Sequence, residues 1–161
     1  MSKIIVVTGT STGLGVRIAV QAAQAGHKVY ATMRNLEKRA ALDAAATSAG
    51  VLLEVIALDV QDSASVEAAI ATVIAKEGCV DVLINNAGAG FVRSTEQATE
   101  AEVQWVMDVN FMGVMRCTKA VMPHMRKARS GHIVTVTSVG GLVGQPFNEI
   151  YCAAKFAAED Y

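Results

Sequence analysis

The sequence contains few charged residues and few cysteines. Only 18% of its 161 residues are charged and the formal net charge is -1, so the chain has no basic footprint for nucleic acid. Its three cysteines, Cys79, Cys117 and Cys152, are odd in number and fit neither a disulfide framework nor a zinc spacing. We therefore interpret them as reduced thiols of a protein core.

Long apolar runs are also missing. No window of the sequence is apolar over the length needed to cross a bilayer, and the run at residues 4–7 is too short for a signal peptide. The sequence therefore predicts a soluble cytoplasmic protein without a membrane partner.

Metal and serine-nucleophile motifs are absent from the sequence as well. His27, His124 and His132 are scattered without the spacing of a metal site, so we expect no metal. No G-x-S-x-G motif of the kind that carries a serine nucleophile is present.

What the sequence does contain is a regular series of short β-branched runs. Hydrophobic residues make up 52% of the chain, as expected for a sheet covered on both faces. The runs are residues 4–8, 28–32, 52–58, 80–84 and 132–137. A segment long enough for a helix separates each from the next. We predict an α/β fold with a doubly wound parallel sheet of the Rossmann type, strand order 3-2-1-4-5 and ligand sites at the carboxyl ends of the strands.

Helical patterns fill the intervening segments. Apolar residues repeat at helical spacing over residues 66–74 and 103–107, and Thr99 with Glu102 predicts a capping box at a helix start. A full fold of this type has a sixth strand, which residues 1–161 do not supply. We therefore expect residues 1–161 to form one dinucleotide-binding domain that is truncated at its C-terminus, with the later strands absent.

A glycine-rich turn, Thr-Gly-Thr-Ser-Thr-Gly-Leu-Gly at residues 8–15, joins the first predicted strand to the first helix. Gly9 permits a tight turn, while Gly13 and Gly15 let backbone N–H groups and the helix N-terminus approach a pyrophosphate. The spacing G-x-x-x-G-x-G differs from the commoner G-x-G-x-x-G, and an ordinary strand-to-helix turn remains an alternative. The predicted cofactor-binding residues in this turn are Gly9, Ser11, Thr12, Gly13, Leu14 and Gly15.

Arg34 follows the second predicted strand, where an acidic side chain would bind a ribose 2'-hydroxyl and an arginine would accept a 2'-phosphate. A guanidinium suits a phosphate in geometry and charge. Arg34 therefore favours NADP(H), with NAD(H) possible. A solvated arginine at a strand end is the alternative.

Polar residues also follow the third and fourth predicted strands at the same sheet edge. Short polar groups and glycine there can hydrogen-bond an adenine and let a cofactor lie close to the backbone, but the same residue types are ordinary turn formers. The predicted cofactor-binding residues here are Asp59, Val60, Asn86, Ala87 and Gly88.

Near the end of the chain, Tyr151 and Lys155 stand four residues apart and therefore share one helix face. Ser138 precedes them at the end of the last predicted strand, and Asn110 lies in the long helical stretch. Each has an ordinary alternative: a surface aromatic for Tyr151, a solvated cation for Lys155, a strand-end hydroxyl for Ser138 and a helix breaker for Asn110.

Together these motifs resemble those of the classical short-chain dehydrogenases/reductases, in order and spacing, over essentially the whole chain. The motifs are residues 8–15, Asp59, residues 85–88, Asn110, Ser138, Tyr151 and Lys155. The stretch 138–152 further resembles the branch that contains hydroxysteroid and retinol dehydrogenases.

The resemblance implies an oxidoreductase that transfers a hydride between a nicotinamide cofactor and an alcohol or carbonyl substrate. A carbonyl that accepts hydride needs a proton, and the hydroxyl of Tyr151 would donate it. Lys155 would favour the tyrosinate and hydrogen-bond the nicotinamide ribose. Ser138 would donate to the substrate oxygen. At Asn110 the family has a helix kink whose backbone holds a water of a proton relay.

Substrate and partner expectations follow from the same resemblance. Leu142, Val143 and Phe147, in the loop between Ser138 and Tyr151, would line one wall of the pocket of a small to medium, rather apolar molecule. In the family, the helices around residues 114–125 and after Tyr151 pack against a second subunit, so we expect a homodimer or homotetramer. The alternative function is a non-catalytic nicotinamide-dinucleotide-binding sensor or interaction protein, which has no physical need for an intact Ser, Tyr and Lys set.

Overall fold

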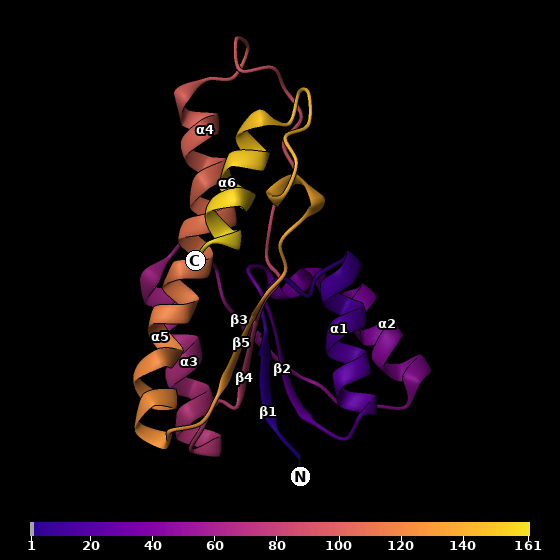
Figure 1. Ribbon diagram of the computed structural model, residues 1–161. Coiled ribbons are helices and arrows are strands. Elements are labelled where there is room, and N and C mark those ends of the chain that lie inside the picture. The colour runs from indigo at the N-terminus through magenta and orange to yellow at the C-terminus, as the bar shows by residue number, and fades with distance from the viewer. Residues whose placement is uncertain (1) are drawn as a thin grey trace.

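Five parallel strands form a single sheet in the order β3-β2-β1-β4-β5 (Figure 1). The computed structural model describes residues 2–161. The strands are β1 (Ile4–Val7), β2 (Lys28–Met33), β3 (Glu54–Ala57), β4 (Val82–Asn85) and β5 (His132–Thr135). The predicted fold class and strand order are confirmed. The third and fifth strands are shorter than predicted, because residues 52–53 and 136–137 make no ladder pairing.

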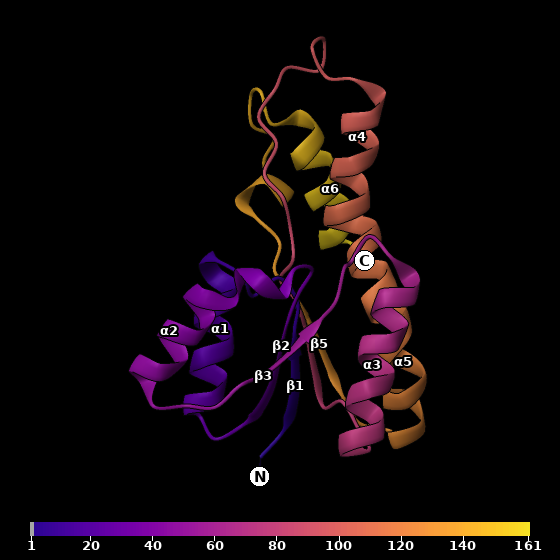
Figure 2. The same cartoon turned by 180° about the vertical axis from the view of Figure 1, so that it is seen from behind.

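Helices cover the two faces of the sheet. The first face carries α1 (Gly13–Gln24) and α2 (Ala40–Ala49), and the second carries α3 (Ser63–Glu77) and α5 (Gly113–Ala128) (Figures 1 and 2). Successive side chains of β1 alternate between the two cores: Val7 packs with the α1 and α2 side, and Val6 with the α3 and α5 side. Both side chains are fully buried.

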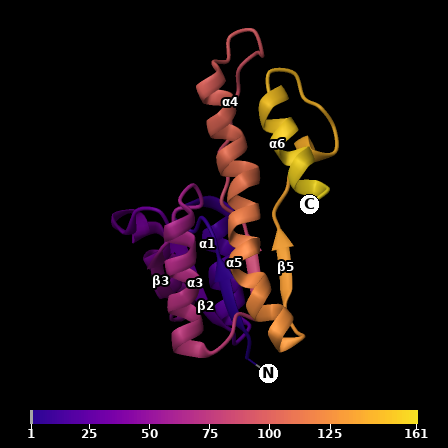
Figure 3. The same ribbon diagram turned by 90° about the vertical axis from the view of Figure 1, so that its left-hand side faces the viewer.

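A long helical rod rises beyond the carboxyl ends of the strands (Figure 3). It consists of α4 (Glu100–Met107), a π-helical segment (Asp108–Met112) and α5. The predicted capping box at the start of α4 is confirmed, since Thr99 Oγ1 accepts from the Glu102 N–H and the Glu102 carboxylate accepts from the Thr99 N–H. The last helix, α6 (Glu149–Glu159), packs on α4.

The edge strand β5 is less covered than its neighbours. Ile133 and Val134 are 38% and 47% exposed, whereas Leu83 on β4 is fully buried. The apolar core therefore centres on β1, β2 and β4. None of the helices within residues 2–161 is both long and apolar enough to span a membrane.

The cysteines are free thiols. Cys117 and Cys152 are buried, as predicted for core thiols, while Cys79 is half-buried. Burial raises the pKa of Cys117 to about 12.

Candidate active site

A cavity of about 470 Å³ lies at the carboxyl ends of the central strands. Its volume falls within the range of roughly 300–1,000 Å³ typical of small-molecule sites. The loops after β1, β2, β3 and β4 all contribute to its wall, because parallel strands end at one edge of the sheet. The residues predicted from sequence that line it are Gly9, Ser11, Thr12, Leu14, Gly15, Arg34, Asp59, Val60, Asn86, Ala87 and Gly88. Gly13 is not among the lining residues.

The glycine turn is packed too tightly for side chains. Gly9 has a φ of +71°, and a Cβ there would stand 2.6 Å from the Ala87 Cα. A Cβ on Gly15 would collide with the Gly9 carbonyl oxygen and stand 2.5 Å from Asn86 Nδ2. α1 begins at Gly13, and the Thr12 side chain caps none of the described backbone groups. The first-turn N–H groups of α1 therefore lack a side-chain cap, as suits an anion site.

Thr8 and Asn86 join the glycine turn to the loop after β4. The Asn86 and Ala87 N–H groups both donate to Thr8 Oγ1 at 3.0 Å. The Asn86 side-chain amide donates to the Thr8 and Gly9 carbonyls at 2.9 and 3.0 Å. Asn86 is therefore more than a turn former, because its amide fixes the floor of the cavity.

Two cations line the cavity after β2. Arg34 is there as predicted, and Lys38 accompanies it from a 3₁₀ turn (Leu36–Arg39). Asn35 caps this turn by accepting from the Glu37 N–H at 2.9 Å. Sequence reasoning missed Lys38, although its position four residues after Arg34 was a usable signal. It also missed Trp105, which projects from α4 into the cavity lining and is 40% exposed.

The loop after β3 is held by its own polar groups. The Asp59 N–H donates to Ser65 Oγ at 3.0 Å, and Asp59 Oδ1 accepts from the Gln61 N–H at 3.0 Å. Asp59, Val60 and Gln61 all line the cavity.

A second cavity, of about 220 Å³, adjoins the first and shares Leu14, Asn86, Gly88 and Ala89 with it. Tyr151 and Lys155, both on α6, line this second cavity, as does Asn110. Lys155 is only 5% exposed, and its ammonium donates to the Val136 carbonyl at 3.0 Å. Burial lowers the pKa of Lys155 below its usual value. The alternative of a solvated cation therefore does not fit the position of Lys155.

Asn110 is fully buried in the π-helical segment, where the resemblance implied a kink. Its Oδ1 accepts from the Ala89 N–H at 3.1 Å, and its Nδ2 donates to the Ala89 and Val106 carbonyls at 3.0 Å. A Cβ on Gly88 would stand 2.9 Å from Asn110 Oδ1 and 3.6 Å from Lys155 Nζ. Asn110 and Lys155 therefore converge on the loop after β4. Asn110 thus lies in the π-helical segment, which continues directly into α5.

Ser138 caps a 3₁₀ turn (Val139–Gly141), and its Oγ accepts from the Gly140 N–H at 3.1 Å. A Cβ on Gly140 would stand 3.5 Å from both Ser138 Oγ and Tyr151 Cε1. Ser138 and Tyr151 therefore both border Gly140, although Ser138 lines neither of the two cavities described above.

The residues predicted to line a substrate pocket lie on the surface of the loop between Ser138 and Tyr151. Leu142, Val143 and Phe147 are 66%, 60% and 61% exposed and line neither of these two cavities. The Phe147 carbonyl accepts from the Arg93 N–H at 2.7 Å, which ties this loop to the segment before α4. Nor do residues 2–161 contain a cluster of His, Cys, Asp or Glu that could hold a metal ion.

The cavity over the glycine turn adjoins a second cavity lined by a tyrosine and a buried lysine, and the chain that builds both cavities matches one known family. Residues 3–161 match the family model described as short chain dehydrogenase, and the chain belongs to this family. The family resemblance of the sequence motifs is thus confirmed.

Individual relatives agree with the predicted branch. Over 164 residues the chain is 44% identical to estradiol 17-beta-dehydrogenase 1 of Rattus norvegicus, covering 98% of this chain and 47% of the relative. It is also 44% identical over 163 residues to retinol dehydrogenase 8 of Homo sapiens, covering 99% of this chain and 51% of the relative. The chain spans about half the length of these curated relatives.

Solved structures agree on the fold. A crystal structure of a variant of actinorhodin polyketide ketoreductase with NADPH superposes with a TM-score of 0.92 at 31% sequence identity, covering 98% of this chain and 61% of that chain.

Proposed function

We propose that this chain is the dinucleotide-binding part of an oxidoreductase that transfers a hydride between NADP(H) and an alcohol or carbonyl group of an apolar small molecule. The observation that carries the proposal is the position of Tyr151 and Lys155. Both line a cavity that shares four lining residues with the one formed by the glycine turn. A proton donor and a cation thus stand at one end of a site built for a dinucleotide.

The residues present fit such a cofactor. The uncapped start of α1 and the side-chain-free glycine turn suit a pyrophosphate, and Asp59 in the loop after β3 suits an adenine or ribose donor. When bound, the nicotinamide would supply or accept the hydride, a reaction for which no side chain of this site is suited.

Arg34 and Lys38 favour NADP(H) over NAD(H). Both line the cavity after β2, where a 2'-phosphate would meet two cations. The NADPH bound by the structurally similar ketoreductase supports the same choice. The test is to titrate NADPH and NADH against wild type and Arg34→Ala. We expect wild type to prefer NADPH and the variant to lose that preference. A wild-type preference for NADH, or an unchanged preference in the variant, contradicts the assignment.

The proton chemistry falls to Tyr151. Its hydroxyl donates a proton to the substrate oxygen during carbonyl reduction and recovers it during alcohol oxidation. Lys155, one helical turn away, places a positive charge 5.8 Å from the centre of the phenol ring. Ser138 holds the substrate oxygen by donating a hydrogen bond to it.

An apolar substrate is supported by the loop between Ser138 and Tyr151. Leu142, Val143 and Phe147 expose large apolar side chains there, and the relatives named above act, by their names, on estradiol and retinol. The test is the activity of the full-length enzyme on apolar ketones and aldehydes, followed by loss of reduced nicotinamide absorbance. Phe147→Ser should raise KM for a bulky apolar ketone and leave KM for acetaldehyde unchanged. NADPH binding without turnover of any carbonyl would favour a cofactor-binding sensor.

A homo-oligomeric assembly is a further part of the proposal. Met122 on α5 and Phe156 on α6 are 40% and 45% exposed, and an exposed apolar side chain on each of these helices suits a subunit contact. Light scattering should give the mass of a dimer or tetramer, and Phe156→Glu should lower it. A monomer at all concentrations contradicts this part.

A further inference from the structure

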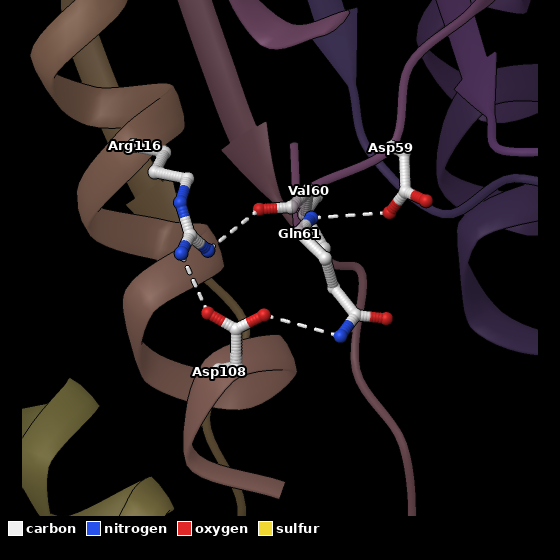
Figure 4. A network of polar contacts seen from close by, with 5 residues as sticks. All are labelled: Asp59, Val60, Gln61, Asp108 and Arg116. Carbon is white, nitrogen blue, oxygen red and sulfur yellow. Dashed lines mark hydrogen bonds and ion pairs between the residues drawn. The ribbon is translucent and has the colours of Figure 1, made fainter. Parts of the chain in front are cut away.

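The loop after β3 is tied to the helical rod by a polar network (Figure 4). Arg116, in the first turn of α5, donates to the Val60 carbonyl at 3.0 Å and to Asp108 Oδ1 at 2.6 Å. The second oxygen of Asp108 accepts from the Gln61 side-chain amide at 3.1 Å. Gln61 in turn donates through its backbone N–H to Asp59 Oδ1. A single chain of hydrogen bonds therefore runs from α5 to the carboxylate of Asp59 (Figure 4).

Val60 is fixed by a second, independent contact. A Cβ on Gly113 would stand 2.9 Å from Val60 Cβ and 3.0 Å from its Cγ2. The start of α5 therefore approaches Val60 as closely as a glycine allows. The backbone carbonyl of Val60 accepts from Arg116 and its side chain contacts Gly113, so both ends of this residue contact α5.

The Asp108–Arg116 pair is better shielded than the surface ion pair between Arg39 and Asp43. Its side chains are 29% and 19% exposed, compared with 48% and 46% for Asp43 and Arg39. Shielding strengthens a charge-assisted hydrogen bond, whereas an exposed pair contributes little. The pair also spans eight residues, a rise of about 12 Å along a helix. It therefore braces the π-helical segment that carries Asn110. The remaining guanidinium N–H of Arg116 and the second oxygen of Asp108 hold the loop after β3.

We propose that Asp108 and Arg116 are positioning residues for the adenine end of the cofactor site, acting through Val60, Gln61 and Asp59. This inference rests on the proposed function, since it assumes that Asp59 and Val60 bind the adenine part of a dinucleotide. The loop after β3 is held from within by the Asp59 contacts to Ser65 and Gln61. The two charged groups on the rod add the contacts that join this loop to the rod, and they help to hold the shape to which an adenine ring would bind.

The test compares ligands that report separately on the two ends of the site. In the full-length enzyme, Arg116→Met should weaken binding of 2',5'-ADP and of NADPH by about ten- to a hundredfold, because the loop loses charge-assisted hydrogen bonds. Binding of reduced nicotinamide mononucleotide should stay unchanged. Trp105, the one tryptophan of the sequence, lines the cavity and gives a fluorescence signal for each titration.

Conservative and control variants separate positioning from general loss of structure. Arg116→Lys keeps the charge but not the planar guanidinium that donates to two acceptors at once. Its affinity for 2',5'-ADP should therefore lie between those of wild type and Arg116→Met. Asp108→Asn should weaken 2',5'-ADP binding, and its effect should not add to that of Arg116→Met, because the two residues act as one unit. Lys119→Met removes a charge from an exposed position of the same helix and should change none of the affinities.

The outcomes are distinct. If wild type binds neither NADPH nor 2',5'-ADP, the proposed function fails. If wild type binds both and Arg116→Met binds 2',5'-ADP as tightly as wild type, the positioning inference alone is wrong. Equal weakening of 2',5'-ADP and of the mononucleotide also overturns it, since that pattern indicates a general structural defect.

Discussion

The ammonium of Lys155 lies 5.8 Å from the centre of the Tyr151 ring and hydrogen-bonds the Val136 carbonyl. A lysine that is 5% exposed and has no carboxylate partner among the described residues is costly for a fold to keep. Its charge stands one helical turn from a phenol, and both groups line the second cavity. The cost is consistent with a functional charge held in place by the backbone after β5.

The buried ammonium makes a prediction about stability and pH. Burial lowers the folded-state pKa of Lys155 below the ordinary 10.5, so the unfolded chain binds more protons between those two values. The contribution of Lys155 to stability therefore rises with pH through this window. As pH falls through this window, Lys155→Met should therefore gain stability relative to wild type. Denaturant unfolding of both proteins at a series of pH values measures this difference. A difference that does not change with pH would show that the lysine is not desolvated.

Gly15 makes a prediction about the glycine turn. In Gly15→Ala the new methyl group meets the Gly9 carbonyl and Asn86 Nδ2, so the turn must shift. We expect NADPH binding to weaken by at least about tenfold, a cost of about 1.4 kcal/mol, even though alanine favours a helix. Gly144→Ala, where a Cβ would meet nothing within 4 Å, serves as the control. Equal affinities in the two variants would remove the turn from the cofactor site.

Two substitutions at Asn110 should separate the role of its amide N–H donor from that of its oxygen acceptor. Asn110→Leu leaves both the N–H and the carbonyl of Ala89 without this partner, at about 1–3 kcal/mol for each buried group left unpaired. Asn110→Asp keeps the acceptor for the N–H but places a carboxyl oxygen against the Ala89 and Val106 carbonyls, so it should lose more stability when that carboxyl is ionised than when it is protonated. Thermal and denaturant unfolding give the comparison. Equal stability of Asn110→Leu and wild type would show that the loop after β4 is held by other contacts.

Much of the fold follows from local patterns. The five strands are β-branched runs, and the Thr99–Glu102 capping box depends on residues three apart, so both can be predicted without tertiary information. The same holds for Tyr151 and Lys155, whose spacing alone places them on one face of a helix. The exposure of Ile133 and Val134 could not be predicted this way, because it depends on what packs against β5.

The parts of the site that sequence reasoning missed depend on contacts between distant segments. Lys38 reaches the cavity only because a 3₁₀ turn brings it alongside Arg34, and Trp105 only because α4 rises beside the loop after β4. The contact between Arg116 and Val60 joins residues 56 positions apart. The expected role of Leu142, Val143 and Phe147 at a substrate pocket stays a prediction, since their loop exposes them at the surface.

The central claim is that Tyr151 is the proton donor, and replacing it with phenylalanine tests this most directly. Tyr151→Phe keeps the ring and removes only the hydroxyl. In the full-length enzyme, we expect turnover of a carbonyl substrate with NADPH to fall by roughly 10²–10⁴-fold, while the Kd for NADPH stays within a factor of about two. Turnover equal to that of the wild type would contradict the account.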